Sequence, residues 1–210
     1  MKSKVLLMIG IIFFVSAGCA TTNEPIHVVD VRAYLTPQDI SGQGYGSTDI
    51  VAFFEDESVR IEVRQISAGD KALTNDILNR LYSKKLIILR MKITNKGDHQ
   101  IIYNPGGTGL ILGKLDYKKP MDYSDFYLLE EARKGHDDNA SRIKTQQDLS
   151  KLRGLYYDLS TRVAEKESVD KLLLFSPPME QSDYALLMIK EFYIGTKTIN
   201  LTFAFDAVLQ

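Results

Sequence analysis

The 210-residue chain has one cysteine, three histidines and no tryptophan. A single cysteine cannot form an internal disulfide, so a disulfide-stapled scaffold is excluded. The 26 lysines and arginines nearly cancel the 27 aspartates and glutamates, which argues against a basic nucleic-acid-binding protein. Average apolar content (44%) and a net charge of −1 exclude a disordered chain. One ordinary globular domain, or two small ones, remains.

The cysteine, Cys19, ends an N-terminal segment of distinct composition. Met1–Lys4 carries two lysines, Val5–Val15 has no charge and no proline, and Ser16–Gly18 consists of small residues. A basic head, an apolar stretch of ~7–15 residues and a small-residue exit are typical of a secretory signal peptide. The stretch is shorter than the ~20 residues with which a helix crosses a membrane. We therefore expect an exported protein.

The residues up to Cys19 resemble the lipobox of bacterial lipoproteins, where Leu, then Ala or Ser, then Gly or Ala precede a lipidated cysteine. Ala17, Gly18 and Cys19 fit this pattern, whereas Ser16 stands where Leu is preferred. The resemblance implies that residues 1–18 are removed and that Cys19 carries a diacylglycerol and an acyl chain. Because one chain anchors only marginally, two or three chains give a lasting membrane anchor. The alternative is an uncleaved signal anchor with an incidental cysteine.

Cleavage before Cys19 would define the mature chain. It leaves 192 residues with 24 basic and 27 acidic side chains, a net charge of −3. Residues 19–25 are small and polar and end in proline, which is typical of a linker between lipid and domain. Ala20 rather than aspartate follows the cysteine. In the Gram-negative sorting rule for lipoproteins this favours the outer membrane, facing the periplasm. No cofactor is expected beyond the covalent lipid on Cys19.

From residue 26 onward, apolar and polar residues alternate with the period of half-buried antiparallel strands. The clearest segments are Val59–Arg64, Leu86–Thr94 and Thr198–Asp206. A turn at Asn95–Asp98 predicts a hairpin over residues 86–104, and the glycine-rich Ser41–Ser47 predicts a loop. Short strands with turn signals every ~8–12 residues predict a mainly β fold, an antiparallel β-sandwich.

Three segments instead have apolar residues at helical spacing. They are Ala72–Tyr82, Ser124–Lys134 and Thr145–Leu159. The last two fall within residues 116–160, which lack an evident core of their own. We therefore expect 26–210 to be a single β-sandwich domain with a helical excursion at about 116–160.

Two stretches resemble the immunoglobulin-like domains of exported bacterial lipoproteins. In that family a strand ending in x-Asn-x-Gly/Ser precedes a turn, and Gly-Glu-Ser-x-x-Gly-x-Leu-x-Phe leads into the final strands. Ile93–Gly97 matches the first pattern and Lys166–Phe175 the second, with Lys166 and Lys171 in the two glycine positions. The resemblance covers about 58–104 and 162–206. It implies an immunoglobulin-like antiparallel β-sandwich with inserted helices, acting as a non-catalytic binding or assembly module.

Candidates for catalysis or metal binding are few. His27, His99 and His136 lack the spacing of a zinc site, and His136–Asn139 lacks the alternation of a calcium loop. Gly106–Lys114 departs from the spacing of a phosphate-binding loop and is typical of a turn between strands. No nucleophile-elbow motif is present in the sequence. We expect no catalytic residue and no metal site.

Aromatic side chains gather in the 116–160 excursion. They are Tyr117, Tyr123, Phe126, Tyr127, Tyr156 and Tyr157. Tyrosine is favoured at interfaces, so these residues form either a partner surface or the contact that packs helices onto the sandwich.

Together these features predict a membrane-anchored exported lipoprotein, a non-catalytic binding or assembly module of the cell envelope. Its partner would be an envelope protein or a glycan, and not a nucleic acid. One alternative is an envelope hydrolase with a site built by the inserted helices. The other is a structural subunit of a secretion or outer-membrane complex.

Overall fold

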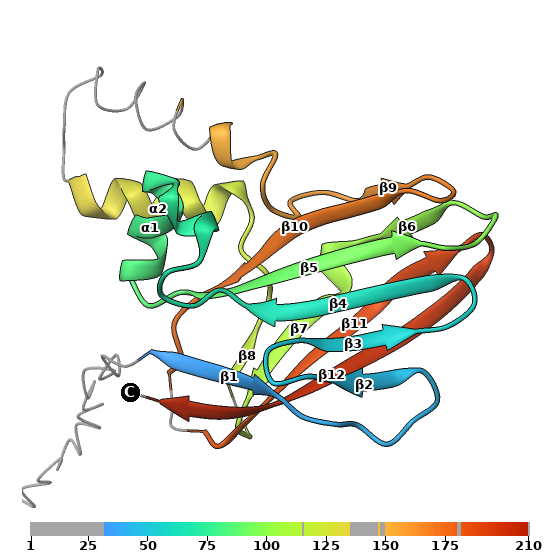
Figure 1. The fold of residues 1–210 in the computed structure, drawn as a ribbon. Coiled ribbons are helices and arrows are strands. Elements are labelled where there is room, and N and C mark those ends of the chain that lie inside the picture. The colour runs from blue at the N-terminus through green and yellow to red at the C-terminus, as the bar shows by residue number, and fades with distance from the viewer. Residues whose placement is uncertain (1–31, 115, 135–146, 148–149, 180–181, 210) are drawn as a thin grey trace, which may run out of the picture.

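The computed structural model describes residues 32–114, 116–134, 147, 150–179 and 182–209. Within them the strands form two antiparallel sheets that pack face to face (Figure 1). The prediction of a mainly β fold with antiparallel sheets and few helices is confirmed. The predicted signal peptide, Cys19 and the linker lie outside the described residues, as do His27 and the His136–Asn139 cluster.

The first sheet is built around a long hairpin. Its strand order is β1 (Ala33–Pro37), β12 (Lys197–Leu209), β11 (Tyr184–Ile194), β6 (Ile101–Tyr103) and β9 (Thr161–Val163). Strand β7 (Thr108–Leu112) pairs with β11 and with β8 (Asp116–Lys118). An irregularity in β11 between Ile189 and Phe192 separates the part that pairs with β7 from the part that pairs with β6. The 3-10 turn η2 (Pro105–Gly107) joins β6 to β7.

The second sheet has a simpler order. It runs β10 (Ser168–Phe175), β5 (Ile87–Asn95), β4 (Val59–Gln65), β3 (Ala52–Glu55) and β2 (Tyr45–Ser47). The prediction of a loop over Ser41–Ser47 is wrong at its end, where β2 pairs with β3. Gly46 lies opposite Phe53, and a Cβ on Gly46 would meet the Phe53 ring at 2.5 Å. Gly46 therefore leaves room for the Phe53 ring of the neighbouring strand and does not indicate a loop.

The main core lies between the two sheets and follows the predicted alternation. On β4, every second residue from Val59 to Val63 is buried, and β12 buries Leu201, Phe203 and Phe205. The intervening side chains of β4 are partly exposed. The strand predictions over these segments are therefore confirmed.

The predicted hairpin over residues 86–104 is wrong. Strand β5 pairs with β4 and β10 in one sheet, whereas β6 pairs with β11 and β9 in the other. The turn after β5 therefore carries the chain from one sheet to the other. The residues of a turn determine that the chain changes direction, but they do not determine whether the strands on either side of the turn pair with each other.

A second hydrophobic core covers the outer face of β5 and β10. Three elements lie over this core: the 3-10 turn η1 (Lys71–Thr74), α1 (Asp76–Ser83) and α2 (Tyr123–Lys134) (Figure 1). The helix predicted over Ala72–Tyr82 is divided at Asn75. The Asn75 side chain accepts hydrogen bonds from the backbone N–H groups of Ile77 and Leu78, which makes it the N-cap of α1.

Residues 116–160 are not a purely helical excursion. Strand β8 belongs to the first sheet. In the segment predicted as a helix over Thr145–Leu159, the described helical residues end at Leu152. Tyr156 then forms a parallel bridge with Leu172 on β10. Tyr156 enters the second core and Tyr157 the main core, so two successive side chains point to opposite sides, as in a strand.

The hydroxyl of Tyr156 has no hydrogen-bond partner among the described residues. Its ring packs edge-on against Phe126 at a centroid distance of 5.0 Å, and burial raises the pKa of its phenol. Tyr156→Phe keeps the ring contact and removes an unsatisfied polar group. We expect the free energy of unfolding, measured by urea denaturation, to stay unchanged or rise by up to about 1 kcal/mol.

Tyr157→Phe is the matched control for this substitution. The Tyr157 hydroxyl donates to the carbonyls of Met91 (3.2 Å) and Val169 (3.4 Å). Its removal should lower the free energy of unfolding by about 1 kcal/mol. A larger loss for Tyr156→Phe than for Tyr157→Phe would contradict the assignment of the unsatisfied hydroxyl.

Candidate functional site

The six aromatic residues for which a partner surface and a packing role were both open differ in their burial. Phe126, Tyr156 and Tyr157 are at most 2% exposed, so the packing alternative describes them. Tyr123 and Tyr127 are partly buried against the second core. Tyr117 is the exposed member: it lies on β8, and a Cβ on Gly109 would meet its ring at 2.3 Å.

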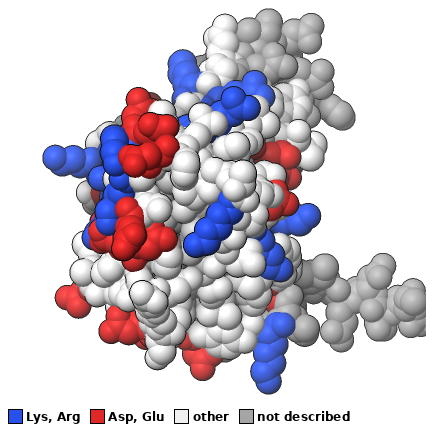
Figure 2. All heavy atoms as spheres, turned by 90° about the vertical axis from the view of Figure 1, so that its right-hand side faces the viewer, with Lys and Arg blue, Asp and Glu red and all other residues white. Residues whose placement is uncertain are grey.

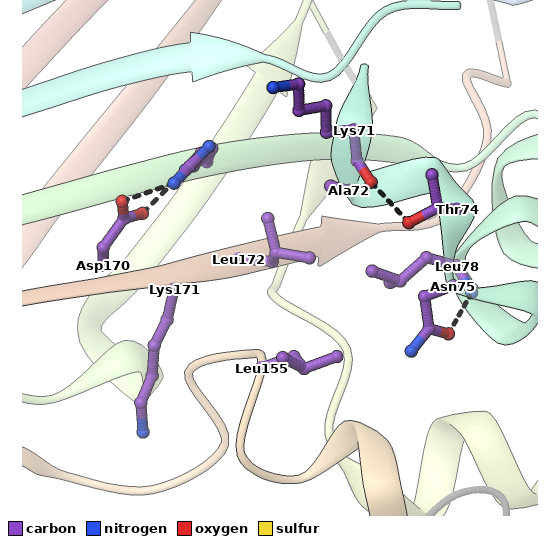
Figure 3. A pocket seen from close by; sticks show the side chains of 10 residues that line it. Lys71, Ala72, Thr74, Asn75, Leu78, Leu155, Asp170, Lys171 and Leu172 are labelled. Carbon is purple, nitrogen blue, oxygen red and sulfur yellow. Dashed lines mark hydrogen bonds and ion pairs between the residues drawn. The ribbon is translucent and has the colours of Figure 1, made fainter. Parts of the chain in front are cut away.

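A pocket of about 380 Å³ lies beside the second core. It opens between η1, the first turn of α1 and the turn that follows Leu152 (Figure 3). We call it the helix–sheet pocket. Its lining residues are Lys71, Ala72, Thr74, Asn75, Leu78, Arg90, Leu155, Asp170, Lys171 and Leu172.

The floor of the helix–sheet pocket is apolar. Leu172 and Leu78 are buried, at 6% and 3% exposure, and belong to the second core. Leu155 is 39% exposed and faces the same space from the turn (Figure 3). An exposed leucine beside a preformed hollow supplies apolar surface that a ligand can cover.

One wall of the helix–sheet pocket is an ion pair between β5 and β10. Arg90 on β5 donates from Nε to Asp170 Oδ1 at 2.8 Å and from Nη2 to Oδ2 at 2.7 Å. This two-point geometry is the strongest that an arginine and a carboxylate form. Because both Asp170 oxygens accept from Arg90, the wall carries no net charge.

A second ion pair supports the rim. The Asp70 carboxylate contacts Arg64 at 2.6 Å and accepts the backbone N–H of Ala72 at 2.9 Å, which caps η1. Burial alone would raise the pKa of Asp70, but the Ala72 and Arg64 hydrogen bonds outweigh it and the pKa lies below its ordinary value. Asp70 therefore stays ionised and is already neutralised by Arg64.

Two lysines border the pocket. Lys71 follows Asp70 at the rim, and Lys171 lies on β10 with its Nζ 5.9 Å from the centre of the Tyr157 ring. Because Tyr157 belongs to the main core and Leu172 to the second core, the Lys171 side chain points away from the pocket floor (Figure 3). Within the described part of the chain neither lysine forms an ion pair. Asn75 adds a neutral donor, because its Oδ1 faces the α1 amides and its Nδ2 is left toward the pocket (Figure 3). The helix–sheet pocket thus combines an apolar floor with a neutralised ion pair, the Asn75 amide and Lys71 at its rim.

None of the pocket residues was among the predicted site residues. They come from four separate segments, and Lys171 enters the sequence analysis only as a residue in a glycine position of the immunoglobulin-like pattern. A local signal exists in the runs Leu86–Leu89 and Leu172–Phe175, which are apolar at every position. Such runs indicate strands covered on both faces, and hence a further layer next to them.

No family model and no curated protein matches the sequence. The chain is similar to several solved structures, of which two follow. The yjhA protein from Bacillus subtilis is 12% identical, with 71% of this chain and 93% of that chain covered and a TM-score of 0.39. A functionally unknown protein from Listeria monocytogenes EGD-e is 13% identical, with 84% and 87% covered and a TM-score of 0.36.

No helix of the described ranges is long and apolar enough to cross a membrane. Across those ranges, no three side chains of the metal-ligating types converge.

The end of the sheets that carries the turn after β5 has charges of both signs. Figure 2 shows acidic and basic side chains side by side on this face. Arg60 pairs with Glu55 and Glu62, and Lys96 with Glu55. Lys96 and then Arg60 hold the pKa of Glu55 below its ordinary value by hydrogen bonding to the carboxylate. This face therefore offers no surface of a single sign.

Proposed function

We propose that this chain is an exported bacterial lipoprotein, anchored through lipid on Cys19, whose immunoglobulin-like β-sandwich binds a ligand or partner without catalysis. The position of Cys19 carries the proposal. The one cysteine of the chain directly follows a basic head, an apolar stretch and three small residues. That is the position where lipidation chemistry needs it.

The start of the folded domain is consistent with an anchor at Cys19. Arg32 donates from Nη2 to the carbonyl of Tyr82 at 2.6 Å, and its guanidinium lies 3.6 Å from the centre of the Tyr82 ring. The chain is therefore held to the domain from Arg32 onward. Twelve residues lie between Cys19 and Arg32, and the thirteen steps of chain from one to the other span at most about 45 Å. The domain would thus stay close to the membrane surface.

The immunoglobulin-like assignment is supported by the two stretches that resemble the family. Asn95, from the first stretch, holds the turn after β5. Lys166, in a glycine position of the second stretch, has φ of +62°, the left-handed conformation that glycine adopts most easily. A left-handed conformation at a position where the family pattern has glycine supports the proposed resemblance.

The lining of the helix–sheet pocket favours binding over hydrolysis. It contains neither histidine nor cysteine, and the Thr74 hydroxyl donates to the carbonyl of Lys71 at 2.8 Å. His99 lies on the turn after β5, near Gly195. That turn is at the end of β5 away from α1 and α2 (Figure 1). The pocket therefore brings together charged and apolar binding groups, but no nucleophile with a base beside it.

Cys19→Ser tests the anchor. In a bacterial host that processes lipoproteins, the unsubstituted chain should fractionate with membranes and have the mass of residues 19–210 plus the attached lipid. Cys19→Ser should leave the signal peptide uncleaved by this route and give a chain without lipid mass. Intact mass spectrometry and membrane fractionation measure both effects.

Ser16→Leu is the matched control, because it completes the lipobox. It should be processed at least as completely as the unsubstituted chain. The proposal fails if Cys19→Ser leaves the mature mass and the fractionation unchanged.

A further inference from the structure

We propose that the helix–sheet pocket binds a small uncharged carbonyl compound, such as a ketone or an ester, with a short hydrocarbon body. This inference names the ligand class of the proposed binding function and rests on that function only for its non-catalytic role. The hydrocarbon would lie on Leu78, Leu155 and Leu172. The carbonyl oxygen would accept a hydrogen bond from the side-chain amide of Asn75.

The orientation of the Asn75 amide is set by the start of α1. Its Oδ1 accepts the backbone N–H groups of Ile77 at 3.0 Å and Leu78 at 3.2 Å. Because the amide nitrogen is a donor and cannot accept these hydrogen bonds, the oxygen faces the helix and Nδ2 faces the opposite side. Nδ2 points toward the space that Leu78 and Leu155 border (Figure 3). Among the described residues none accepts a hydrogen bond from Nδ2, so this donor is available to a ligand.

The hydrocarbon requirement follows from the floor of the pocket. Leu172 and Leu78 belong to the second core, and Leu155 leaves over a third of its surface open next to them. A ligand without hydrocarbon would leave this surface in water, whereas each methylene that is buried against it favours binding. A volume of about 380 Å³ is near the lower limit for ligand pockets, which favours a small molecule.

The ion pairs beside the pocket leave no net charge for a ligand. Arg90 donates to both oxygens of Asp170, and Arg64 contacts Asp70 at 2.6 Å. Two arginines and two aspartates therefore balance. A charged ligand would give up its hydration for a wall that is already neutral, which costs more than the transfer of an uncharged one.

The two lysines that border the pocket do not supply a charge to the floor either. Lys171 lies over the Tyr157 ring, on the face of β10 opposite to Leu172. In Figure 3 the ammonium groups of Lys71 and Lys171 point apart and away from the leucine side chains. The Asn75 amide does face the floor, and the complement of this donor is an acceptor such as a carbonyl oxygen.

The test compares hexan-2-one, hexan-1-ol, hexanoate and hexylamine, which have the same number of carbon atoms and differ in polar group. Proton–nitrogen NMR titrations of the full-length chain in detergent micelles follow the Asn75 side-chain amide, and partition of each probe into empty micelles gives its free concentration. We expect hexan-2-one to shift the Asn75 signals and to bind roughly tenfold more tightly than hexanoate and hexylamine. Binding of either charged probe as tightly as hexan-2-one would overturn the choice of an uncharged ligand.

Asn75→Asp separates the hydrogen bond from the apolar contact. Aspartate caps a helix as well as asparagine does, so α1 is kept, but an oxygen that repels a carbonyl replaces the Nδ2 donor. The affinity for hexan-2-one should fall about fivefold, whereas hexan-1-ol, whose hydroxyl can donate to the new carboxylate, should keep its affinity. Asn79→Asp is the matched control, exposed on the same helix and outside the pocket lining, and should change neither. Unchanged affinities in Asn75→Asp, or an equal loss for both probes, would overturn the role of Asn75.

Leu155→Ala tests the hydrocarbon contact. It should weaken hexan-2-one and hexan-1-ol alike, by about threefold, because both lose the same apolar surface. Leu159→Ala is the matched control: this leucine is 68% exposed and outside the pocket lining, so its removal should change neither affinity. Unchanged affinities in Leu155→Ala would overturn the assignment to this pocket.

The outcomes separate this inference from the anchor. A chain that is lipidated but does not prefer hexan-2-one to the charged probes would overturn the pocket assignment alone. A chain that prefers hexan-2-one but gains no lipid at Cys19 would overturn the anchor alone.

Discussion

Lys118→Met should lower the free energy of unfolding by about 3–5 kcal/mol. Lys118 and Asp116 are 4% and 1% exposed and point inward from β8, with Nζ 2.7 Å from Oδ1. Neither of these two atoms has a hydrogen-bond partner besides that contact among the described residues. Without the ammonium, the buried carboxylate keeps only the backbone N–H of Met179, which donates to Oδ2 at 2.9 Å.

The paired substitution separates a buried charge from a lost contact. Asp116→Asn together with Lys118→Met removes both charges, keeps the side-chain volumes and leaves an oxygen for the Met179 amide. A buried ion pair replaced by neutral groups of similar volume is often neutral or stabilising. We expect the double variant to recover most of the lost stability in urea denaturation. A single Lys118→Met within 1 kcal/mol of the unsubstituted chain would contradict the prediction.

The clearest alternation of buried and solvent-reaching residues belongs to strands that face a single core. On β4, Val59, Ile61 and Val63 are buried on one side and the residues between them reach solvent on the other. This alternation is a local property, so a sequence shows it without knowledge of the partner strand. The same holds for β12, where Leu201, Phe203 and Phe205 line the core.

The predictions failed where contacts with a second layer or a second sheet determine the local structure. Tyr156 and Leu152 fit a helical spacing with their neighbours, but Tyr156 instead bridges to β10 and packs on Phe126. The hairpin after β5 failed because its two strands choose partners in different sheets. Both outcomes depend on contacts between residues far apart in the chain, and tertiary packing overrides local preference there.

The helix–sheet pocket could not be predicted from the sequence for the same reason, because it also depends on contacts between residues far apart in the chain. In the sequence alone, Arg90 and Asp170 have the pattern of exposed strand residues. Lys71 has the pattern of a solvated residue near the start of a helix. They become a site because β5 and β10 lie side by side and η1 packs over them. For the aromatic residues of 116–160 the sequence left open whether they bind a partner or pack the helices, and in the structure Phe126 and Tyr156 pack in the second core and Tyr157 in the main core.

Asn95→Ala should lower the free energy of unfolding by about 3 kcal/mol or more. The Asn95 side chain is buried, and its Nδ2 donates to the carbonyls of His99 (2.9 Å), Ala164 (3.0 Å) and Val163 (3.2 Å). Its Oδ1 accepts the backbone N–H of Gly97 at 3.1 Å. Each buried polar group left without a partner costs about 1–3 kcal/mol. The residue also joins the end of β5 in one sheet to the end of β9 in the other.

Asn95→Asp tests the donors separately. The new carboxyl keeps an acceptor for Gly97 but faces three carbonyl oxygens, so its ionised form is disfavoured in the folded state. Its pKa should therefore lie above the unfolded value of about 3.9. Stability should be largest below that value and fall as the pH rises through the folded-state pKa. Urea denaturation between pH 3 and pH 8 measures this change relative to the unsubstituted chain, and a pH profile parallel to that chain would show that the Nδ2 bonds contribute little.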